Sequence, residues 1–455
     1  MEKEEFGKRG SWGSKVAFVF AASGSAIGLG SMWRFPLMVG RNGGAIFVFA
    51  YILSVFFIGF TIMLAELSLG RHTQRNPVGV FEQIKPRSSW KLVGYIAIIT
   101  CICILSYYAV VAGWAFGYLY KILTGTFKGE VNWNLSEKIF IDFAANPLEV
   151  SLCLLVIMAL TTLIISRGVK GGIEKWSKIL MPMLFFLIIL LALRAMTLGG
   201  AGTGLSFYLK PDLSKLNWNV FFFSIGQAFY SLSLGMGIML TYGSYITKRE
   251  NLVSSAGWVC FSTTLVALLT GIIIFPTLFA TPGLSPKEFE PSTGLMFQVF
   301  PIVISKIPGG FLFGALFFFL LLVAALTSTI SLLEVPVAYL IDEKNWPRKR
   351  ASLTVGFLTF LLAFPSALSN GAFKSLTQWN FMSKMDLWFG NIILAFGGLC
   401  ICIFLVYSWG VKKALEEISH GASRFKLRPI WVFNIKFLAP LAIIVILIFI
   451  RKITG

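Results

Sequence analysis

Apolar residues follow one another in long runs along this chain, and charged residues gather mostly in the segments between the runs. About 20 apolar residues in a helix are enough to cross the roughly 30 Å hydrocarbon core of a bilayer. The chain is therefore predicted to be an all-α integral membrane protein. The pattern predicts eleven spans, at residues 14–37, 43–70, 90–123, 148–167, 173–198, 218–247, 252–280, 308–341, 350–369, 384–410 and 430–450.

The first span is interrupted in its middle by small residues. Between Val16 and Pro36 the sequence reads VAFVFAASGSAIGLGSMWRFP, with glycine and serine at its centre. Glycine is a weak helix former and serine competes for backbone hydrogen bonds, so this composition predicts local unwinding. Unwound backbone is tolerated at membrane depth only where it is buried in protein or lines a water-filled cavity. A helix-packing face of small residues is the alternative for this span alone.

A second interruption, in the sixth span, favours the first of these interpretations. Residues 218–246 read WNVFFFSIGQAFYSLSLGMGIMLTYGSYI, again with serine and glycine near the middle. Interrupted spans at corresponding places in two halves of a chain point to a transport site near the bilayer midplane. We therefore expect two repeats of opposite topology, residues 14–198 and 218–410. A cytoplasmic segment, residues 1–13, would precede them, and an eleventh helix at 430–450 would follow.

The charge distribution indicates a topology rather than a nucleic-acid partner. The 455 residues are 56% hydrophobic and 13% charged, with a net charge of +19. The predicted outer segments carry roughly half as many lysines and arginines as the inner ones, which is the positive-inside bias. The predicted partner is thus the lipid bilayer of the plasma (inner) membrane. The N-terminus would lie in the cytoplasm and, after eleven spans, the C-terminus outside.

The sequence offers few candidates for catalytic or metal-binding residues. The six cysteines all lie in apolar runs, and neither of the two histidines has a cysteine at metal-ligand spacing. The spans hold no constellation of serine with histidine, of paired aspartates or of metal ligands. The sequence therefore favours a transport or binding protein over an enzyme.

Five motifs in order resemble the neurotransmitter:sodium symporter family. They are GSAIGLGSMWRFP, NGGAIF, AELSLGR, GQAFYSLSLGMG and ALTSTISLLE. The resemblance covers spans 1 to 10 and is closest to the bacterial amino-acid transporters, including members with eleven transmembrane helices. It implies a leucine-transporter-type fold, a 5+5 inverted repeat with broken helices 1 and 6 plus an eleventh helix. It also implies alternating access driven by sodium.

The resemblance implies one complete sodium site, the second of the family. Its ligands would be the backbone carbonyls of Gly24, Ile27 and Ala324 with the hydroxyls of Thr327 and Ser328. A hard cation prefers oxygen ligands, and neutral ones avoid burying net negative charge. The alternative for the two hydroxyls is hydrogen bonding to the preceding turn of their own helix.

The first sodium site of the family departs from the usual pattern here. Its two side-chain amides fall on Ser31 and Thr263, while the Ala26 carbonyl and Ser231 remain available. Serine and threonine reach less far than asparagine, so this site could be weakened, rebuilt with water or lost. The resemblance therefore implies one or two sodium ions.

The resemblance disfavours chloride as a further ion. Three of the family's chloride ligands match Tyr51, Gln227 and Ser231, but the remaining position falls on Ala267, which is neither a hydroxyl nor an acid. Thr263 or Thr264 is the alternative ligand at this position.

Gly28 indicates the class of substrate. Monoamine-carrying relatives have an aspartate at this position, and glycine leaves the substrate to bring its own carboxylate, as an α-amino acid does. Met236, between two glycines, is polarizable and adaptable, so it could make room for a bulky side chain or simply fill the core. The implied substrate-binding residues are Ser25, Gly28, Leu29, Gly30, Ile104, Tyr108, Tyr230, Ser233, Met236, Ser328 and Leu332.

Charged residues at the two ends of the implied pathway are expected to form gates. Arg34 with Asp386 would close the outer side, and Arg9 with Asp342 and Tyr245 the inner side. A charge within a span is costly, so a functional or structural role is the default for such a residue.

Glu66, near the end of the second span, is a further intramembrane charge. We expect it to cap backbone groups that the break in the sixth span leaves free.

Together these features predict a sodium-coupled symporter that imports a neutral, hydrophobic or aromatic L-amino acid. One alternative keeps the fold with a single sodium and possible proton coupling. Another is a sensor that binds an amino acid without transporting it.

Overall fold

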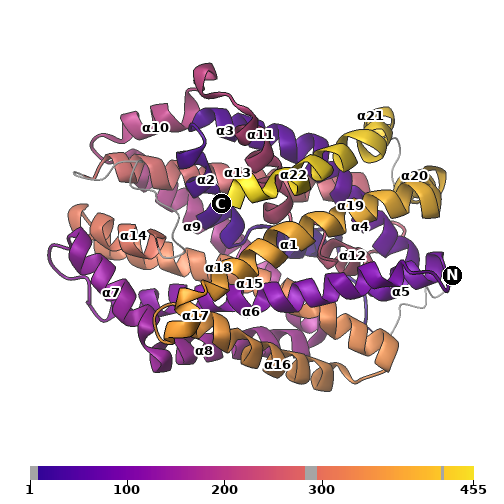
Figure 1. Cartoon of the computed structure of the whole chain (residues 1–455), viewed down its shortest axis with the longest axis horizontal. Coiled ribbons are helices and arrows are strands. Elements are labelled where there is room, and N and C mark those ends of the chain that lie inside the picture. The colour runs from indigo at the N-terminus through magenta and orange to yellow at the C-terminus, as the bar shows by residue number, and fades with distance from the viewer. Residues whose placement is uncertain (1–8, 282–294, 422–424, 455) are drawn as a thin grey trace.

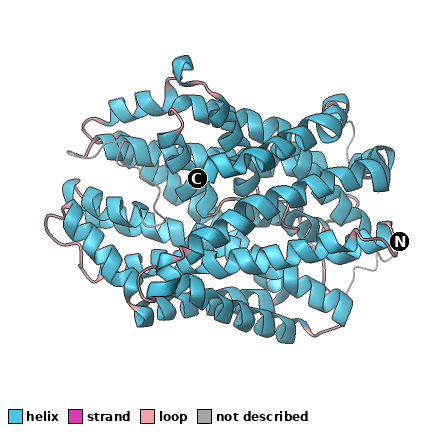
Figure 2. Ribbon diagram, in the orientation of Figure 1, coloured by secondary structure: helices cyan, strands magenta, loops and turns pink. Residues whose placement is uncertain are grey.

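The computed structural model describes residues 9–281, 295–421 and 425–454. Residues 1–8 of the predicted N-terminal segment lie outside these ranges. Helices joined by short loops make up most of the described residues, and these residues form no strand (Figure 2). The helices are α1 (Lys15–Ala26), α2 (Phe35–Arg41), α3 (Ala45–Ser54), α4 (Phe60–Thr73), α5 (Pro77–Ile84), α6 (Lys91–Leu123), α7 (Trp133–Ala145), α8 (Pro147–Ser166), α9 (Lys175–Met196), α10 (Ala201–Leu209), α11 (Trp218–Ser231), α12 (Ile238–Gly243), α13 (Leu252–Phe279), α14 (Leu295–Lys306), α15 (Gly310–Lys344), α16 (Arg348–Leu368), α17 (Lys374–Gln378), α18 (Phe381–Met385), α19 (Leu394–Ile403), α20 (Val411–Ser419), α21 (Arg428–Phe433) and α22 (Ala439–Thr454).

The predicted spans correspond to helices with small shifts at their ends. π-Helical segments join some of these helices into longer ones, as between α3 and α4 and from α18 to α20. Counted in this way, nine helices within the described ranges are long and apolar enough to cross a membrane, and Lys15–Ala26 with Gly30–Arg41 forms a tenth, bent by 52°. The predicted sixth span is divided into α11, of 14 residues, and α12, of 6 residues, each too short to cross alone. The number of eleven spans therefore stays a prediction.

The first predicted break lies directly after α1. Ile27 leaves helical geometry with φ −87° and ψ 73°, and the helix resumes as a π-helical turn at Gly30–Arg34 that leads into α2. Residues 27–29 thus join two half-helices at an angle, as the glycine and serine content predicts.

The second predicted break separates α11 from α12. Ser233, Gly235 and Gly237 have φ values of 54°, 79° and 80°, the left-handed region that favours glycine. A Cβ atom added to Gly235 would lie 2.1 Å from the carbonyl oxygen of Leu394, so a side chain has no room there.

The long helix α15 packs along α6 and also contacts α1 and α12 (Figure 1). The short helices α7, α10 and α14 gather at one end of the bundle, and α5, α20 and α21 at the other. This packing brings the middle of α15 opposite the first break. The site is therefore built where two broken segments meet two continuous helices.

Candidate functional site

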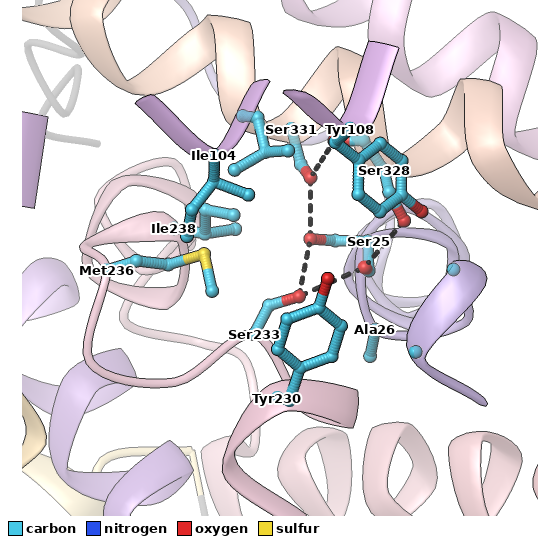
Figure 3. Close-up of a pocket in the computed structure, with 13 residues that line it drawn as sticks. Ser25, Ala26, Ile104, Tyr108, Tyr230, Ser233, Met236, Ile238, Ser328 and Ser331 are labelled. Atoms are coloured by element: carbon cyan, nitrogen blue, oxygen red, sulfur yellow. Dashed lines mark hydrogen bonds between the residues drawn. The ribbon is translucent and has the colours of Figure 1, made fainter. Parts of the chain in front are cut away.

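A pocket lies between the two breaks, lined by residues of both broken segments, α6 and α15 (Figure 3). All of the implied substrate-binding residues line it except Leu29, whose backbone contacts Tyr108. Sequence reasoning did not place Ile238 and Ser331 there. Ser331 follows Ser328 by three residues, so it lies on the same face of α15, and that spacing was an available signal.

Hydroxyl groups meet on one side of the pocket around Ser25. The Ser25 hydroxyl donates to Ser331 Oγ at 2.7 Å, and its carbonyl accepts from Ser233 Oγ and from Ser328 Oγ, both at 3.0 Å. These hydrogen bonds connect the end of α1 to the second break and to α15. Figure 3 shows the serines converging on this point.

The backbone of the first break faces Tyr108. The Leu29 N–H donates to the Tyr108 hydroxyl at 2.8 Å. A Cβ atom on Gly28 would lie 2.3 Å from Ser328 Oγ and 2.4 Å from the Tyr108 hydroxyl, and one on Gly30 would lie 2.5 Å from the Tyr230 ring. A side chain has no room at either glycine, so the backbone of the first break closely approaches these three side chains.

Apolar side chains form the opposite side of the pocket. Met236, Ile238 and Ile104 lie together there, across from Tyr108 and Ser328 (Figure 3). Backbone polar groups freed by the breaks can bind charged groups, whereas the aliphatic side chains can bind an apolar one. The pocket thus suits a small molecule with a charged end and an apolar end.

A cluster of oxygen atoms lies between α1 and α15, beside the pocket. Ser328 Oγ, which donates to the Ser25 carbonyl, also lies 3.5 Å from the Gly24 carbonyl oxygen. Thr327 Oγ1 donates to the Ala324 carbonyl of its own helix at 2.9 Å. A Cβ atom on Gly24 would be 3.1 Å from the Thr327 Cβ, so the two backbones approach closely. Ile27 ends α1 three residues after Gly24. Both hydroxyls can rotate to turn a lone pair toward a cation held by these carbonyls.

The residues implied for the first sodium site make separate contacts and do not share one hydrogen-bonded cluster. Ser31 Oγ donates to the Ala26 carbonyl at 3.3 Å, and the Ser231 hydroxyl contacts the Tyr51 hydroxyl at 2.9 Å. Thr263 Oγ1 instead donates at 2.8 Å to a carbonyl one turn earlier in α13. Hydrogen bonds within the same helix are a common alternative for a membrane threonine.

On one side of the pocket, the guanidinium of Arg34 lies 4.6 Å from the Tyr230 ring centre. The side chain of Asn391 links Arg34 to Asp386, its predicted partner in the outer gate. Arg34 donates to Asn391 Oδ1 at 2.6 Å, and Asn391 donates to Asp386 Oδ2 at 3.3 Å. Tyr107 donates to the other oxygen of Asp386 at 2.9 Å. Asn391 lies in the π-helical segment that begins at Asp386, which places their side chains together.

On the other side, Arg9 pairs directly with Asp342. Their Nε and Oδ1 atoms are 2.7 Å apart, and the side chains are only 3% and 10% exposed. Arg9 also donates to the Tyr245 hydroxyl at 3.2 Å, and Tyr245 donates to Glu334 Oε1 at 2.6 Å. Arg348 pairs with the same Glu334 at 2.8 Å. The sequence reasoning missed Glu334 and Arg348, although a glutamate in a span was a visible signal.

Glu66 contacts the second break as predicted. The N–H of Gly235 donates to Glu66 Oε1 at 2.7 Å, and Glu66 is fully buried. A carboxylate from α4 thereby satisfies a backbone group that the loss of helix leaves without its usual partner.

Comparisons with known proteins agree with this architecture. Residues 9–145 and 134–454 match the model of the sodium:neurotransmitter symporter family. The uncharacterized sodium-dependent transporter YhdH of Bacillus subtilis is 37% identical over 96% of both chains. An uncharacterized sodium-dependent transporter of Haemophilus influenzae is 34% identical over 97% of this chain and 98% of its own.

A solved structure supports the fold directly. The crystal structure of MhsT in complex with L-phenylalanine has a TM-score of 0.88 and 39% sequence identity, over 97% of this chain and 99% of that one. The overlap confirms the predicted fold class, and the family is one of transporters that use sodium. This multi-pass membrane protein, a sodium-dependent symporter, belongs to the sodium:neurotransmitter symporter family.

Proposed function

We propose that this protein imports a neutral, hydrophobic or aromatic L-amino acid together with sodium, by alternating access. The observation that carries the proposal is the pocket itself, in which freed backbone groups face an apolar wall. The complex of the related MhsT with L-phenylalanine supports a substrate of this class.

The proposed orientation of the substrate follows from the charges available. Its carboxylate meets the backbone N–H groups at Leu29 and Gly30 and the Tyr108 hydroxyl, since helix N-termini favour anions. Its ammonium meets carbonyl groups near Tyr230 and Ser233, at the end of α11, where the helix dipole favours a cation. The side chain then extends toward Met236 and the other apolar residues.

One sodium ion is proposed between α1 and α15, at the carbonyls of Gly24, Ile27 and Ala324 and the hydroxyls of Thr327 and Ser328. The approach of Gly24 to Thr327 supports this placement, because it brings neutral oxygens of both helices together. An ion that joins these helices favours the arrangement in which they are close, and this differential affinity couples sodium to conformation.

A second sodium, at Ala26, Ser31, Ser231 and Thr263, is the weaker part of the proposal. Thr263 and Thr327 both donate a hydrogen bond within their own helices, so this contact does not separate the two sites. The loss of both side-chain amides, at Ser31 and Thr263, is what favours a variant with a single sodium, in which a proton could accompany the substrate. Chloride is not proposed, because Ala267 offers no ligand beside Tyr51 and Gln227.

Orientation and gating complete the proposed cycle. The N-terminus lies in the cytoplasm and the C-terminus outside the plasma membrane. Arg9, Asp342 and Tyr245 form the inner gate. Arg34 and Asp386 form the outer gate, with Asn391 between them. Each gate must open once in every cycle.

Uptake into proteoliposomes tests the proposal. Radiolabelled tryptophan, tyrosine and leucine would be supplied at varied sodium, with fixed pH and membrane potential. Uphill uptake that requires sodium is expected, and a sigmoidal sodium dependence would indicate two ions, whereas a hyperbolic one would indicate one. Binding without uphill uptake would point to a sensor, and uptake without sodium would overturn the coupling.

Met236→Phe is expected to shift the substrate preference toward smaller side chains. Phenylalanine is bulkier and stiffer than methionine, so it reduces the space beside Ile104 and Ile238. We expect the uptake efficiency for tryptophan to fall about tenfold relative to leucine. Competition of unlabelled amino acids against labelled leucine measures this ratio.

The control for this variant is Met196→Phe, at the exposed end of α9. An unchanged ratio in Met236→Phe would assign Met236 to core packing.

A further inference from the structure

We propose that Cys101 is a positioning residue for substrate selectivity, acting through the backbone of Met236. The inference rests on the proposed function, because it concerns which amino acids the pocket prefers. Cys101 does not line the pocket. Its thiol holds the peptide group from which the Met236 side chain projects.

The contact joins α6 to the second break. Cys101 is fully buried, and its Sγ lies 3.0 Å from the Met236 carbonyl oxygen, to which the thiol donates. From α4, Glu66 accepts the N–H of the preceding residue, Gly235, at 2.7 Å. Two side chains from different helices thus hold the backbone on both sides of the Met236 Cα.

The backbone needs such restraint at this point. Gly235 and Gly237, on either side of Met236, adopt φ values of 79° and 80°. Glycine permits many backbone conformations, so the two glycines do little to fix the orientation of the Met236 carbonyl group. A buried carbonyl without a partner is costly, and the thiol of Cys101 supplies a donor inside the protein.

The same turn of α6 also contributes to the pocket. Ile104 follows Cys101 by three residues and therefore lies on the same face of the helix. Its side chain lines the pocket near that of Met236 (Figure 3). One turn of α6 therefore contributes to the apolar side of the pocket in two ways. The Ile104 side chain lines it, and the Cys101 thiol holds the backbone of Met236.

Loss of the thiol should relax the discrimination between large and small substrates. Without this donor the Met236 peptide can rotate, and its side chain no longer holds one position. In Cys101→Ala and Cys101→Val we expect the tryptophan-to-leucine ratio of apparent affinities to move toward one by about three- to tenfold. The maximal uptake rate and the sodium dependence should stay as in the wild type.

Cys101→Ser keeps a donor at the same place and should retain the wild-type ratio. Valine removes the donor while filling more of the volume than alanine, so the two variants together separate hydrogen bonding from packing. Cys103→Ala is the matched control, because Cys103 is only half-buried and lies on a different face of α6.

The measurement is competition of tryptophan and leucine against labelled leucine in proteoliposomes. An unchanged ratio in the alanine and valine variants would overturn the proposal, as would a serine variant that behaves like alanine. A changed ratio in Cys103→Ala would also overturn it. A wild-type protein that transports none of these amino acids would instead refute the proposed function, which keeps the two failures distinct.

Discussion

Replacing Thr327 and Ser328 together with alanine is expected to abolish sodium-dependent uptake. The two hydroxyls are two of the five oxygen ligands proposed for the ion between α1 and α15. A sodium ion that has lost part of its water shell needs protein oxygens in place of that water. Without the two hydroxyls, the buried ion would be left with too few ligands. Each single variant should raise the sodium concentration for half-maximal uptake by about tenfold or more.

Thr329→Ala is the matched control for this experiment. The Thr329 hydroxyl is also buried in α15, but it contacts Thr161 on α8 at 2.7 Å and so faces away from the proposed ion site. Uptake and its sodium dependence are measured in proteoliposomes at fixed membrane potential. If the double variant transports with the sodium dependence of the wild type, the ion does not bind at these residues.

Gly28→Ala is expected to remove most transport through direct obstruction. The added methyl group would lie 2.3 Å from Ser328 Oγ and 2.4 Å from the Tyr108 hydroxyl, both far below contact distance. It would enter the space proposed for the substrate carboxylate and would also disturb a proposed sodium ligand. Overpacking of this kind costs enough for uptake efficiency to fall by about ten- to a hundredfold.

Gly226→Ala provides the comparison, because a Cβ atom there meets no other atom within 4 Å. Thermal stability of the purified variants in detergent separates lost folding from lost transport. A stable Gly28→Ala protein that transports normally would show that the substrate carboxylate does not approach this position.

The sequence was sufficient to predict the elements that depend on local composition. Glycine and serine in the middle of two apolar runs identified both breaks, because these residues weaken a helix wherever they occur. The predicted spans end within a few residues of the helix ends, except the tenth, whose helix continues to Ser419. Most of the pocket followed from the motifs, since Ser25, Tyr230 and Ser328 lie in stretches that resemble the family.

Contacts between distant segments were not predictable in the same way. Asn391 between Arg34 and Asp386, and Arg348 beside Glu334, depend on how separate helices pack. Nothing in the local sequence of Cys101 indicates that its thiol meets a carbonyl 135 residues further along the chain. In each case the local sequence does not distinguish the residue from other polar residues, and its partner comes close only when the chain folds.

The two closures of the pocket differ in kind, and this difference has a kinetic consequence. One side is held by a direct, buried ion pair between Arg9 and Asp342, whereas the other relies on a neutral amide between two charges. Opening the Arg9 side separates two opposite charges that are hydrogen-bonded to each other, whereas opening the other side breaks hydrogen bonds to an amide, and we expect the second step to cost less. In the proposed orientation, with Arg9 toward the cytoplasm, we therefore expect the empty carrier to open outward more readily than inward, which would suit the capture of scarce nutrients from dilute surroundings.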